Sequence, residues 1–373
     1  MIDIHPIDTS SRREVKRFLD FPFQLYRHVP QWVPPFASDA KRMLDRKKHP
    51  FYQHSAAEFF IAQEADRVVG RIAVLDHRPY NEWNHSSTAF FYLFEVENNR
   101  EAAQGLIDAA IEWARARGLT QIFGPKGFSL LDGMGLLVKG FQHRPALGIS
   151  YHLDYYAGLL EDAGFVGTSD IVSGYLGPEF VLPDKILKIA ELVQQRRGLR
   201  IARYQKRSDL KHLIGPMKDL YNSALSGTTD TFPITDEEAQ LMAKQLLMFA
   251  DPRLIKIVMK DDEIVGFLFG YPDPSAAIQR CKGRLFPIGW LDILIELKRT
   301  KWINLNGAGI LAPYRGLGVN AILYVEMQKT IASGNFAHAD IVQIEESVLT
   351  LDDARTMGAE VYKKHRIYEK VVD

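Results

Sequence analysis

Two stretches of the chain share one pattern of apolar and polar positions. In FFIAQEADRVVGRIAVL (59–75), an apolar run is followed by polar residues and then by a second apolar run. Two apolar runs separated by a short polar turn predict a β-hairpin. The pattern returns in IKIVMKDDEIVGFLFGY (255–271), where Gly266 takes the place of Gly70. The sequence therefore predicts two equivalent hairpins.

The segments after the two hairpins also correspond. TAFFYLFEV (88–96) precedes a helical pattern over Arg100–Arg117, and KWINLNGAGIL (301–311) precedes one over Gly316–Ser333. Apolar residues at helical spacing predict that both helices pack on a core. These residues are Ala103, Ile107, Ala110, Ile111 and Ala114 in the first helix and Leu323, Met327 and Ile331 in the second.

Each predicted helix leads into a further strand, Leu119–Gly124 in the first half and Asp340–Ile344 in the second. A strand-helix-strand unit allows parallel pairing, so each half is expected to contain a mixed sheet. The last segments of the halves, 159–176 and 353–370, match as well. The expected fold class is α/β, with two tandem domains that pack as a pseudo-dimer within the chain.

The length and one linker-like segment agree with two domains. The 373 residues exceed what one hydrophobic core usually supports. GPEFVLPD (Gly177–Asp184) contains Pro178 and Pro183 and breaks both the strand and the helix patterns. We therefore predict an N-terminal domain over 1–177 and a C-terminal domain over 185–373.

Composition limits the partners. Lys+Arg and Asp+Glu both total 46, so no net charge favours nucleic acid or an anionic membrane, and neither is expected as a partner. The N-terminus shows no apolar signal region, and the expected location is cytoplasmic. The single cysteine, Cys281, excludes an internal disulfide and is interpreted as a small apolar residue.

The second half carries an insertion within Asp273–Arg299 that the first half lacks. It includes LFPIGWLDILIELKR, whose spacing predicts an amphipathic helix. We expect this helix to pack on the core rather than to lie on a membrane surface.

A turn in the second half carries the chemical signal. ILAPYRGLGVNAIL places Gly316 and Gly318 between a strand and a helix, just after Arg315. Each glycine costs about 0.5–1 kcal/mol relative to alanine, so close approach by a ligand is one explanation for the pair. A helix N-terminus and an arginine together suit a phosphate. The alternative is a plain tight turn into a helix. A dinucleotide-binding glycine motif is excluded, because Ala321 stands where its third glycine would be.

The segment LAPYRGLGVNAIL resembles the acyl-CoA signature of the GNAT N-acetyltransferase superfamily, with Arg315, Gly318 and Asn320 at its defining positions. Asn320 departs from the Gly or Ala usual there. The order of the predicted elements follows the same family in both halves. The whole chain is similar to a bacterial group of tandem GNAT-like proteins.

The resemblance implies a cofactor and its site. Acetyl-CoA or another acyl-CoA would bind once, in the C-terminal domain. In the first half, Glu97, Asn98 and Asn99 replace the arginine and glycines, so that copy is expected to have lost the cofactor. The residues implied for binding are Gly309, Ile310, Leu311, Arg315, Gly316, Leu317, Gly318, Val319 and Asn320.

The catalytic residues are less well marked. The proton-donating tyrosine common in GNAT enzymes is replaced by Leu160 in the first half and Ala354 in the second. Glu345, Glu346 and Tyr362 are the candidates for acid and base, with ordinary strand-end residues as the alternative. No metal-ligand spacing occurs.

The resemblance implies an acyl-CoA-dependent N-acyltransferase acting on a small amine or amino-acid-like acceptor. Two alternatives stay open, because a fold does not establish an activity. One is a noncatalytic module that binds acyl-CoA or another small ligand. The other is an aminoacyl transferase of the tandem-GNAT type. A monomer is expected, since the contact within the chain would replace a homodimer interface.

Overall fold

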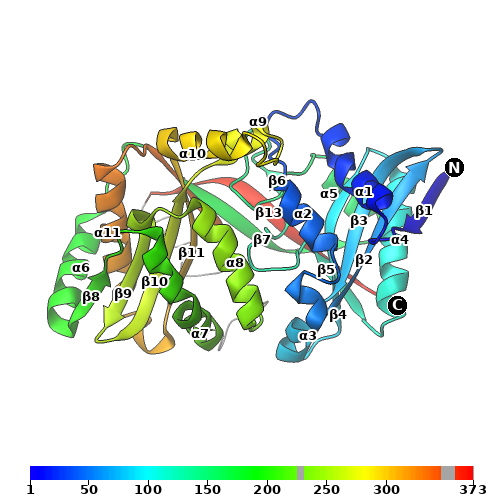
Figure 1. Cartoon of the computed structure of the whole chain (residues 1–373). Coiled ribbons are helices and arrows are strands. Elements are labelled where there is room, and N and C mark those ends of the chain that lie inside the picture. The colour runs from blue at the N-terminus through cyan, green and yellow to red at the C-terminus, as the bar shows by residue number, and fades with distance from the viewer. Residues whose placement is uncertain (225–230, 346–357, 373) are drawn as a thin grey trace. The chain divides into compact units, whose positions relative to one another are not determined.

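The computed structural model describes residues 1–224, 231–345 and 358–372, and its helices and strands are drawn in Figure 1. The chain forms two compact units, and neither is one continuous stretch. Unit 1 consists of Met1–Val172, Ser275–Asp292 and Lys363–Asp373. Unit 2 consists of Ser173–Pro274 and Ile293–Tyr362.

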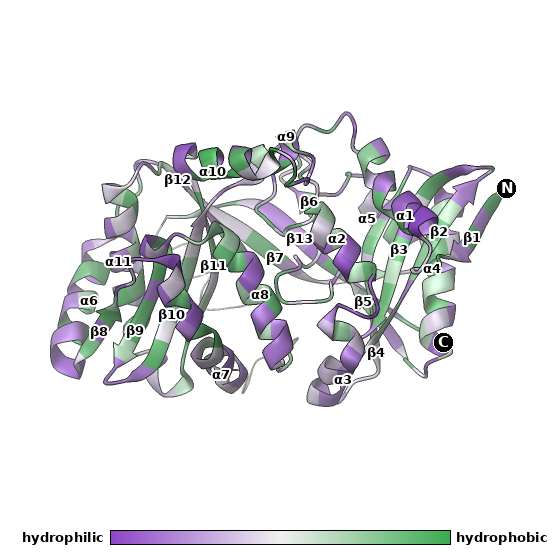
Figure 2. Ribbon diagram, in the orientation of Figure 1, coloured by the Kyte–Doolittle hydropathy of each residue, from purple (hydrophilic) through white to green (hydrophobic). Residues whose placement is uncertain are grey.

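Unit 1 is built on a mixed sheet with strands in the order β1-β2-β3-β4-β5-β13. Adjacent strands in this sheet are antiparallel, except that β4 and β5 are parallel. Strand β3 is buried along nearly its whole length and hydrophobic in Figure 2. The strands are β1 (Ile2–Pro6), β2 (Ala56–Glu64), β3 (Arg67–Asp76), β4 (Thr88–Val96), β5 (Gln121–Gly124), β6 (Leu136–Lys139), which pairs with β13, and β13 (Glu360–Val371).

The core of unit 1 lies between this sheet and helix α4. The five apolar residues predicted to face the core from α4 are all buried, which confirms the helical pattern. They pack against Phe91, Phe94 and Val96 of β4. The helices are α1 (Arg12–Leu25), α2 (Ala37–Leu44), η1 (Pro50–Gln53), α3 (Arg78–Asn84), α4 (Arg100–Arg115), α5 (Tyr156–Asp162) and α9 (Ser275–Arg280).

Unit 2 is built on a second mixed sheet, in the order β7-β12-β11-β10-β9-β8. Strands β11 and β12 are parallel, whereas β8, β9, β10 and β11 pair antiparallel in turn. Both predicted hairpins are therefore present, as β2–β3 and β9–β10. The strands are β7 (Val166–Leu176), which begins in unit 1, β8 (Leu199–Ala202), β9 (Ile255–Lys260), β10 (Glu263–Pro272), β11 (Trp302–Ile310) and β12 (His338–Glu345).

Helices α11 and α6 cover one face of the second sheet. Leu323 and Met327 of α11 are buried in a core with Val258 and Ile303, and Ile331 packs at its margin. The helices are α6 (Asp184–Arg197), η2 (Arg207–Leu213), α7 (Ile214–Ala224), α8 (Asp236–Phe249), η3 (Pro252–Leu254), α10 (Gly289–Arg299), which begins in unit 1, η4 (Ala312–Tyr314) and α11 (Val319–Ser333).

The internal repeat extends to backbone detail. Gly70 of β3 pairs with Val96 of β4, and Gly266 of β10 pairs with Ile310 of β11. In both sheets the register slips a few residues further along, which marks a β-bulge. Three residues before Val96, Leu93 has φ +50°, and three before Ile310, Gly307 has φ +107°. The two halves are copies of one fold.

The last strands of the two halves are not where a simple tandem would put them. From Lys363 onward, β13 belongs to unit 1, where it pairs antiparallel with β5. The end of β7, from Ser173, belongs to unit 2, where it lies beside β12. Each unit is completed by the final strand of the other half. The predicted division at Gly177–Asp184 itself stays a prediction.

Candidate functional site

The parallel strands of unit 2 separate partway along their length. The β11–β12 ladder runs from the pair Trp302 and His338 to the pair Leu305 and Ile341. Beyond Leu305, β11 continues beside β10 as far as Ile310, and Gly307 and Ala308 are exposed. Strand β12 continues to Glu345 without pairing with β11, and we call the region between the unpaired ends of these two strands the opening.

One set of backbone groups on β11 faces this opening. The N–H of Leu311 donates to the carbonyl of Val265 at 3.0 Å. Because successive residues of a strand direct their backbone groups to opposite sides, the N–H and C=O of Ile310 face away from β10. The carbonyl of Ile310 accepts a hydrogen bond from Nε of Arg315 at 3.2 Å. Arg315 is exposed, so its guanidinium lies at the mouth of the opening.

The two glycines of the turn after β11 have different structural reasons. Gly316 has φ +70° and Gly318 has φ +86°, values that favour glycine. A Cβ on Gly318 would lie 2.8 Å from a methyl carbon of Val193 in α6. A Cβ on Gly316 would meet nothing within 4 Å. Gly318 is therefore explained by the fold itself, whereas the space above Gly316 is open.

Helix α11 begins at this turn with its first residues positioned for an anion. Its N-cap is Gly318, which has no side chain, and its first turn carries no acidic residue. The departure at Asn320 has a local consequence, because its Oδ1 accepts the N–H of Ala321 at 3.0 Å. The positive end of the helix dipole stays directed at the opening. Of the nine predicted cofactor residues, Val319 is buried in the core under α11, and the cofactor-binding role of all nine stays a prediction.

The equivalent place in unit 1 is filled by the protein's own side chains. Val96 corresponds to Ile310 by register. Its N–H donates to Oη of Tyr156 at 3.1 Å, and its C=O accepts from Oη of Tyr155 at 2.7 Å. Tyr156 is fully buried. In unit 1 both backbone groups of Val96 are therefore bonded to tyrosine hydroxyls, whereas in unit 2 the carbonyl of Ile310 is bonded to Arg315.

The helix N-terminus of unit 1 is also capped internally. Asn99 accepts the N–H of Ala102 at 3.0 Å through its side chain. Glu97 is paired with Arg67, so its negative charge is compensated. The expectation that the first half has lost the cofactor stays a prediction, and in this half both backbone groups of Val96 already have tyrosine partners.

A buried polar cluster lies on the sheet face of unit 2 opposite α11. Ile303 and Ala339 pack in the α11 core, so their neighbours Asn304 and Asp340 point to the other face. These two residues pair across the ladder one step before the strands separate. Each is 2% exposed. Nδ2 of Asn304 donates to Oδ1 of Asp273 at 3.3 Å.

Two tyrosines complete this cluster. Tyr362 of β13 donates a hydrogen bond to Asp340, and Tyr271 of β10 bonds with Asn306. Burial raises the pKa of Tyr362, and the negative charge of Asp340 raises it further. Burial likewise raises the pKa of Tyr271. Both phenols are protonated at neutral pH, so a carboxylate and a proton donor meet at Asp340 and Tyr362.

The predicted catalytic residues have different outcomes. Tyr362 lies in the cluster. Glu345 ends β12, but its side chain is not described, and Glu346 lies outside the described residues. Their roles stay predictions. Asp340 is not among the predicted catalytic residues, because the sequence predicts it only as the first residue of a strand. The signal that could have found it is a carboxylate within the strand HADIVQI.

Unit 1 lacks this cluster. The third pair of its parallel ladder is Phe90 and Phe123, in the positions that Asn304 and Asp340 occupy in unit 2. Lys126, which is buried, lies over the rings of Phe90 and Phe123, with Nζ 5.0 and 5.7 Å from their centroids. An aromatic pair cannot accept a proton, so the acid-base arrangement is confined to unit 2.

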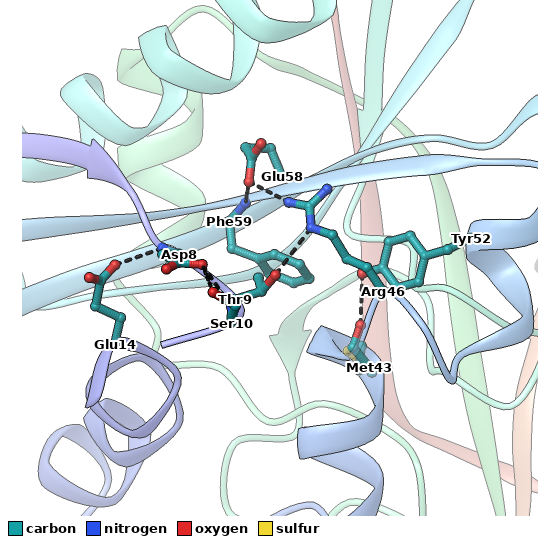
Figure 3. A network of polar contacts seen from close by, with 9 residues as sticks. All are labelled: Asp8, Thr9, Ser10, Glu14, Met43, Arg46, Tyr52, Glu58 and Phe59. Carbon is teal, nitrogen blue, oxygen red and sulfur yellow. Dashed lines mark hydrogen bonds and ion pairs between the residues drawn. The ribbon is translucent and has the colours of Figure 1, made fainter. Parts of the chain in front are cut away.

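Unit 1 has a different polar network, near the start of β2 (Figure 3). Arg46 donates from Nη2 to Glu58 at 2.6 Å and from Nε to Thr9 at 3.2 Å. Nearby, Asp8 accepts from the hydroxyl of Ser10 at 2.7 Å, which lowers the pKa of its carboxyl. These bonds link two loops, the one before α1 and the one after α2, to strand β2. The network is partly exposed, and we interpret it as an anchor for the loops.

The described residues, 1–224, 231–345 and 358–372, contain no group of three or more His, Cys, Asp or Glu side chains placed to hold a metal ion. Within the same ranges, no helix is both long and apolar enough to cross a bilayer.

Comparison with known proteins supports the fold. No family model matches the chain. Protein YghO of Escherichia coli K12 is 25% identical, over 97% of this chain and 94% of that protein. The bacterial ceramide synthase of Caulobacter vibrioides is 26% identical, over 99% of this chain and 98% of that protein.

Solved structures of similar fold include tandem GNAT proteins. A tandem GNAT protein from the clavulanic acid biosynthesis pathway matches with a TM-score of 0.57 and 13% identity, over 100% of this chain and 99% of that one. A GCN5-related N-acetyltransferase from Sphaerobacter thermophilus matches with a TM-score of 0.52 and 13% identity, over 100% and 96%. The chain resembles the GNAT superfamily and has the fold of tandem GNAT proteins, as the sequence predicted.

Proposed function

We propose that the protein is an acyl-CoA-dependent N-acyltransferase whose reaction takes place in unit 2. The observation that carries the proposal is the position of Asp340, a buried carboxylate bonded to Tyr362, one ladder step before β11 and β12 separate. In the GNAT superfamily that separation receives the pantetheine arm of acyl-CoA. The thioester would then lie beside the carboxylate.

The cluster can supply both proton transfers of the reaction. The amine nitrogen attacks the thioester carbonyl carbon and forms the C–N bond, and its proton passes to Asp340. As the C–S bond breaks, the departing thiolate takes the phenolic proton of Tyr362. The proton on Asp340 then returns to Tyr362 along their hydrogen bond. The products are an amide and free CoA, and Tyr362 provides the acid that Ala354 cannot.

The turn supplies binding for the other end of the cofactor. The N–H of Ile310 faces the opening and can hold a pantetheine carbonyl. The exposed Arg315 and the open space above Gly316 lie beside the N-terminus of α11. A helix N-terminus with an arginine beside it suits the pyrophosphate of CoA. Unit 1 would bind none, because Tyr155 and Tyr156 occupy the equivalent groups.

For the acceptor we propose a long-chain amine. The relative named bacterial ceramide synthase aligns over 99% of this chain, and a ceramide is an amide formed on the amino group of a sphingoid base. A long-chain amine fits that chemistry better than the small amine or amino-acid-like acceptor expected from the sequence. The same likeness favours an acyl-CoA longer than acetyl-CoA.

The test is an acyl-transfer assay with acetyl-CoA and palmitoyl-CoA against sphinganine, a small amine and an amino acid. Release of the CoA thiol and the mass of the amide product are measured together. We expect an amide of sphinganine with the longer acyl chain. Product only with the small acceptors would contradict the acceptor class. Binding of acyl-CoA with no turnover on any amine would instead support the noncatalytic module.

A further inference from the structure

The segment 282–301 exposes an unusual amount of apolar surface. Thirteen large hydrophobic side chains are exposed in the described part of the chain, and six of them lie within ten consecutive positions. Phe286 is 81% exposed and Ile288 is 73% exposed. Among the thirteen, only Met1 is more exposed than Phe286, and Val181 is as exposed as Ile288. The six are Phe286, Ile288, Trp290, Leu291, Leu294 and Ile295.

Helix α10 directs these residues to one side. Trp290, Leu291, Leu294 and Ile295 are exposed, while Ile293 is buried. Spacings of one, three and four residues place the exposed set on a single helix face. Figure 2 shows hydrophobic residues along α10. The expectation that this amphipathic helix packs its apolar residues on the core is wrong for this face.

Local bonds hold the exposed residues in place. The N–H of Trp290 donates to the carbonyl of Leu285 at 2.8 Å, and its indole N–H donates to the carbonyl of Pro287 at 3.0 Å. Arg280 makes two bonds to the carboxylate of Asp292, at 2.9 and 2.8 Å. The apolar surface is therefore a fixed feature of the fold.

Basic residues flank this apolar surface on both sides. Lys282 and Arg284 precede it, and Lys298, Arg299 and Lys301 follow it, all of them exposed. The carboxylate of Asp292 is neutralised by Arg280. Glu296, the other carboxylate of α10, is half-buried, so the fully exposed charged residues of segment 282–301 are all positive, although the whole chain has a formal net charge of zero.

We propose that segment 282–301 is an interfacial anchor that binds the surface of an anionic phospholipid bilayer. Phenylalanine, tryptophan and leucine insert at the boundary between headgroups and acyl chains, and lysine and arginine bind the anionic headgroups. The eleven residues of α10 are too few to span a bilayer. This inference departs from the expectation of no membrane partner, which was based on net charge alone.

The anchor would bring the protein to the lipid phase, in which a long-chain amine and a long acyl chain partition. It does not rest on the proposed function, because the patch is argued from exposure and charge only. Vesicle binding can therefore succeed or fail whether or not the protein transfers acyl groups.

The experiment is flotation of the full-length protein with vesicles of equal parts phosphatidylglycerol and phosphatidylcholine, without substrate. The wild type should float with these vesicles, less so at high salt, and should not float with pure phosphatidylcholine. Leu291→Glu with Leu294→Glu should abolish flotation. The matched control is Leu187→Glu with Leu192→Glu on α6, where leucines of similar exposure, 38% and 46%, lie outside the patch; this variant should float like the wild type.

A second variant tests the charges. Each basic residue near an anionic surface changes binding by about fivefold, so removing the charges of Lys282 and Arg284 with glutamine should weaken it by about thirtyfold. Circular dichroism checks that each variant is folded. Wild-type protein that stays with the soluble fraction would overturn the proposal. So would a patch variant that still floats, or light scattering showing that the patch variant only breaks a dimer.

Discussion

Replacing Tyr156 by phenylalanine should destabilise unit 1 measurably, although it removes one oxygen atom. The hydroxyl of Tyr156 accepts the N–H of Val96 at 3.1 Å, and both residues are completely buried. Phenylalanine keeps the ring in place but leaves that N–H without its acceptor. An unsatisfied buried donor costs about 1–3 kcal/mol. For a domain of roughly 200 residues, this corresponds to a fall of about 2–12 °C in the unfolding midpoint.

Hydrogen exchange locates the effect. In peptides containing Val96, the variant should exchange about 5- to 150-fold faster than the wild type, which is the same free energy expressed as a rate. Tyr314→Phe is the matched control, because its hydroxyl makes one long bond, 3.4 Å, to Glu263 at the surface. This control should change the free energy of unfolding by less than about 1 kcal/mol. An unchanged midpoint and unchanged exchange in Tyr156→Phe would refute the idea that this side chain closes the unit 1 opening.

Three further predictions concern catalysis, the glycine turn and pH. Asp340→Asn should lower kcat by about 10²- to 10⁴-fold with little change in the KM for acyl-CoA, because it removes the base; Asp261→Asn, at an exposed turn, should behave like the wild type. Gly318→Ala should destabilise unit 2 by more than Gly316→Ala, since only the former brings a Cβ to 2.8 Å from Val193; equal unfolding midpoints would contradict this. Burial lowers the pKa of His152 to about 3 and that of His365 to about 4. Because both pKa values are depressed, the stability present above about pH 6.5 is lost as the pH falls. In His152→Gln, which can still accept the N–H of Leu137, the unfolding midpoint should fall less steeply with decreasing pH. An equally steep fall in the variant would count against the assignment.

The elements could be predicted from the sequence because their signals are local. The alternation around Gly70 and Gly266 and the helical spacing of Ala103, Ile107 and Ala110 depend on neighbours a few residues apart. The turn with Arg315 and its glycines could be found for the same reason. The fold and the position of the opening in unit 2 both follow from these signals.

Contacts between distant residues could not be predicted in this way. Val96 and Tyr156 are 60 positions apart, and no pattern in either segment records that they meet. The pairing of β13 with β5 joins the last strand of the chain to its first half. The polar cluster depends on this kind of pairing, because it joins Asp340 to Tyr362. The amphipathic spacing of α10 was visible, but spacing does not tell which face is left uncovered.

The most direct test of the account is the number of acyl-CoA molecules bound per chain, measured by titration calorimetry with CoA and palmitoyl-CoA. The structure predicts one site, lost in Arg315→Glu and kept in the control Lys329→Glu, which changes an exposed cation further along α11. Asp340→Asn should still bind one equivalent, because the role proposed for Asp340 is to accept a proton and not to hold the cofactor. Two equivalents per chain, or undiminished affinity in Arg315→Glu, would contradict the assignment of the cofactor to unit 2.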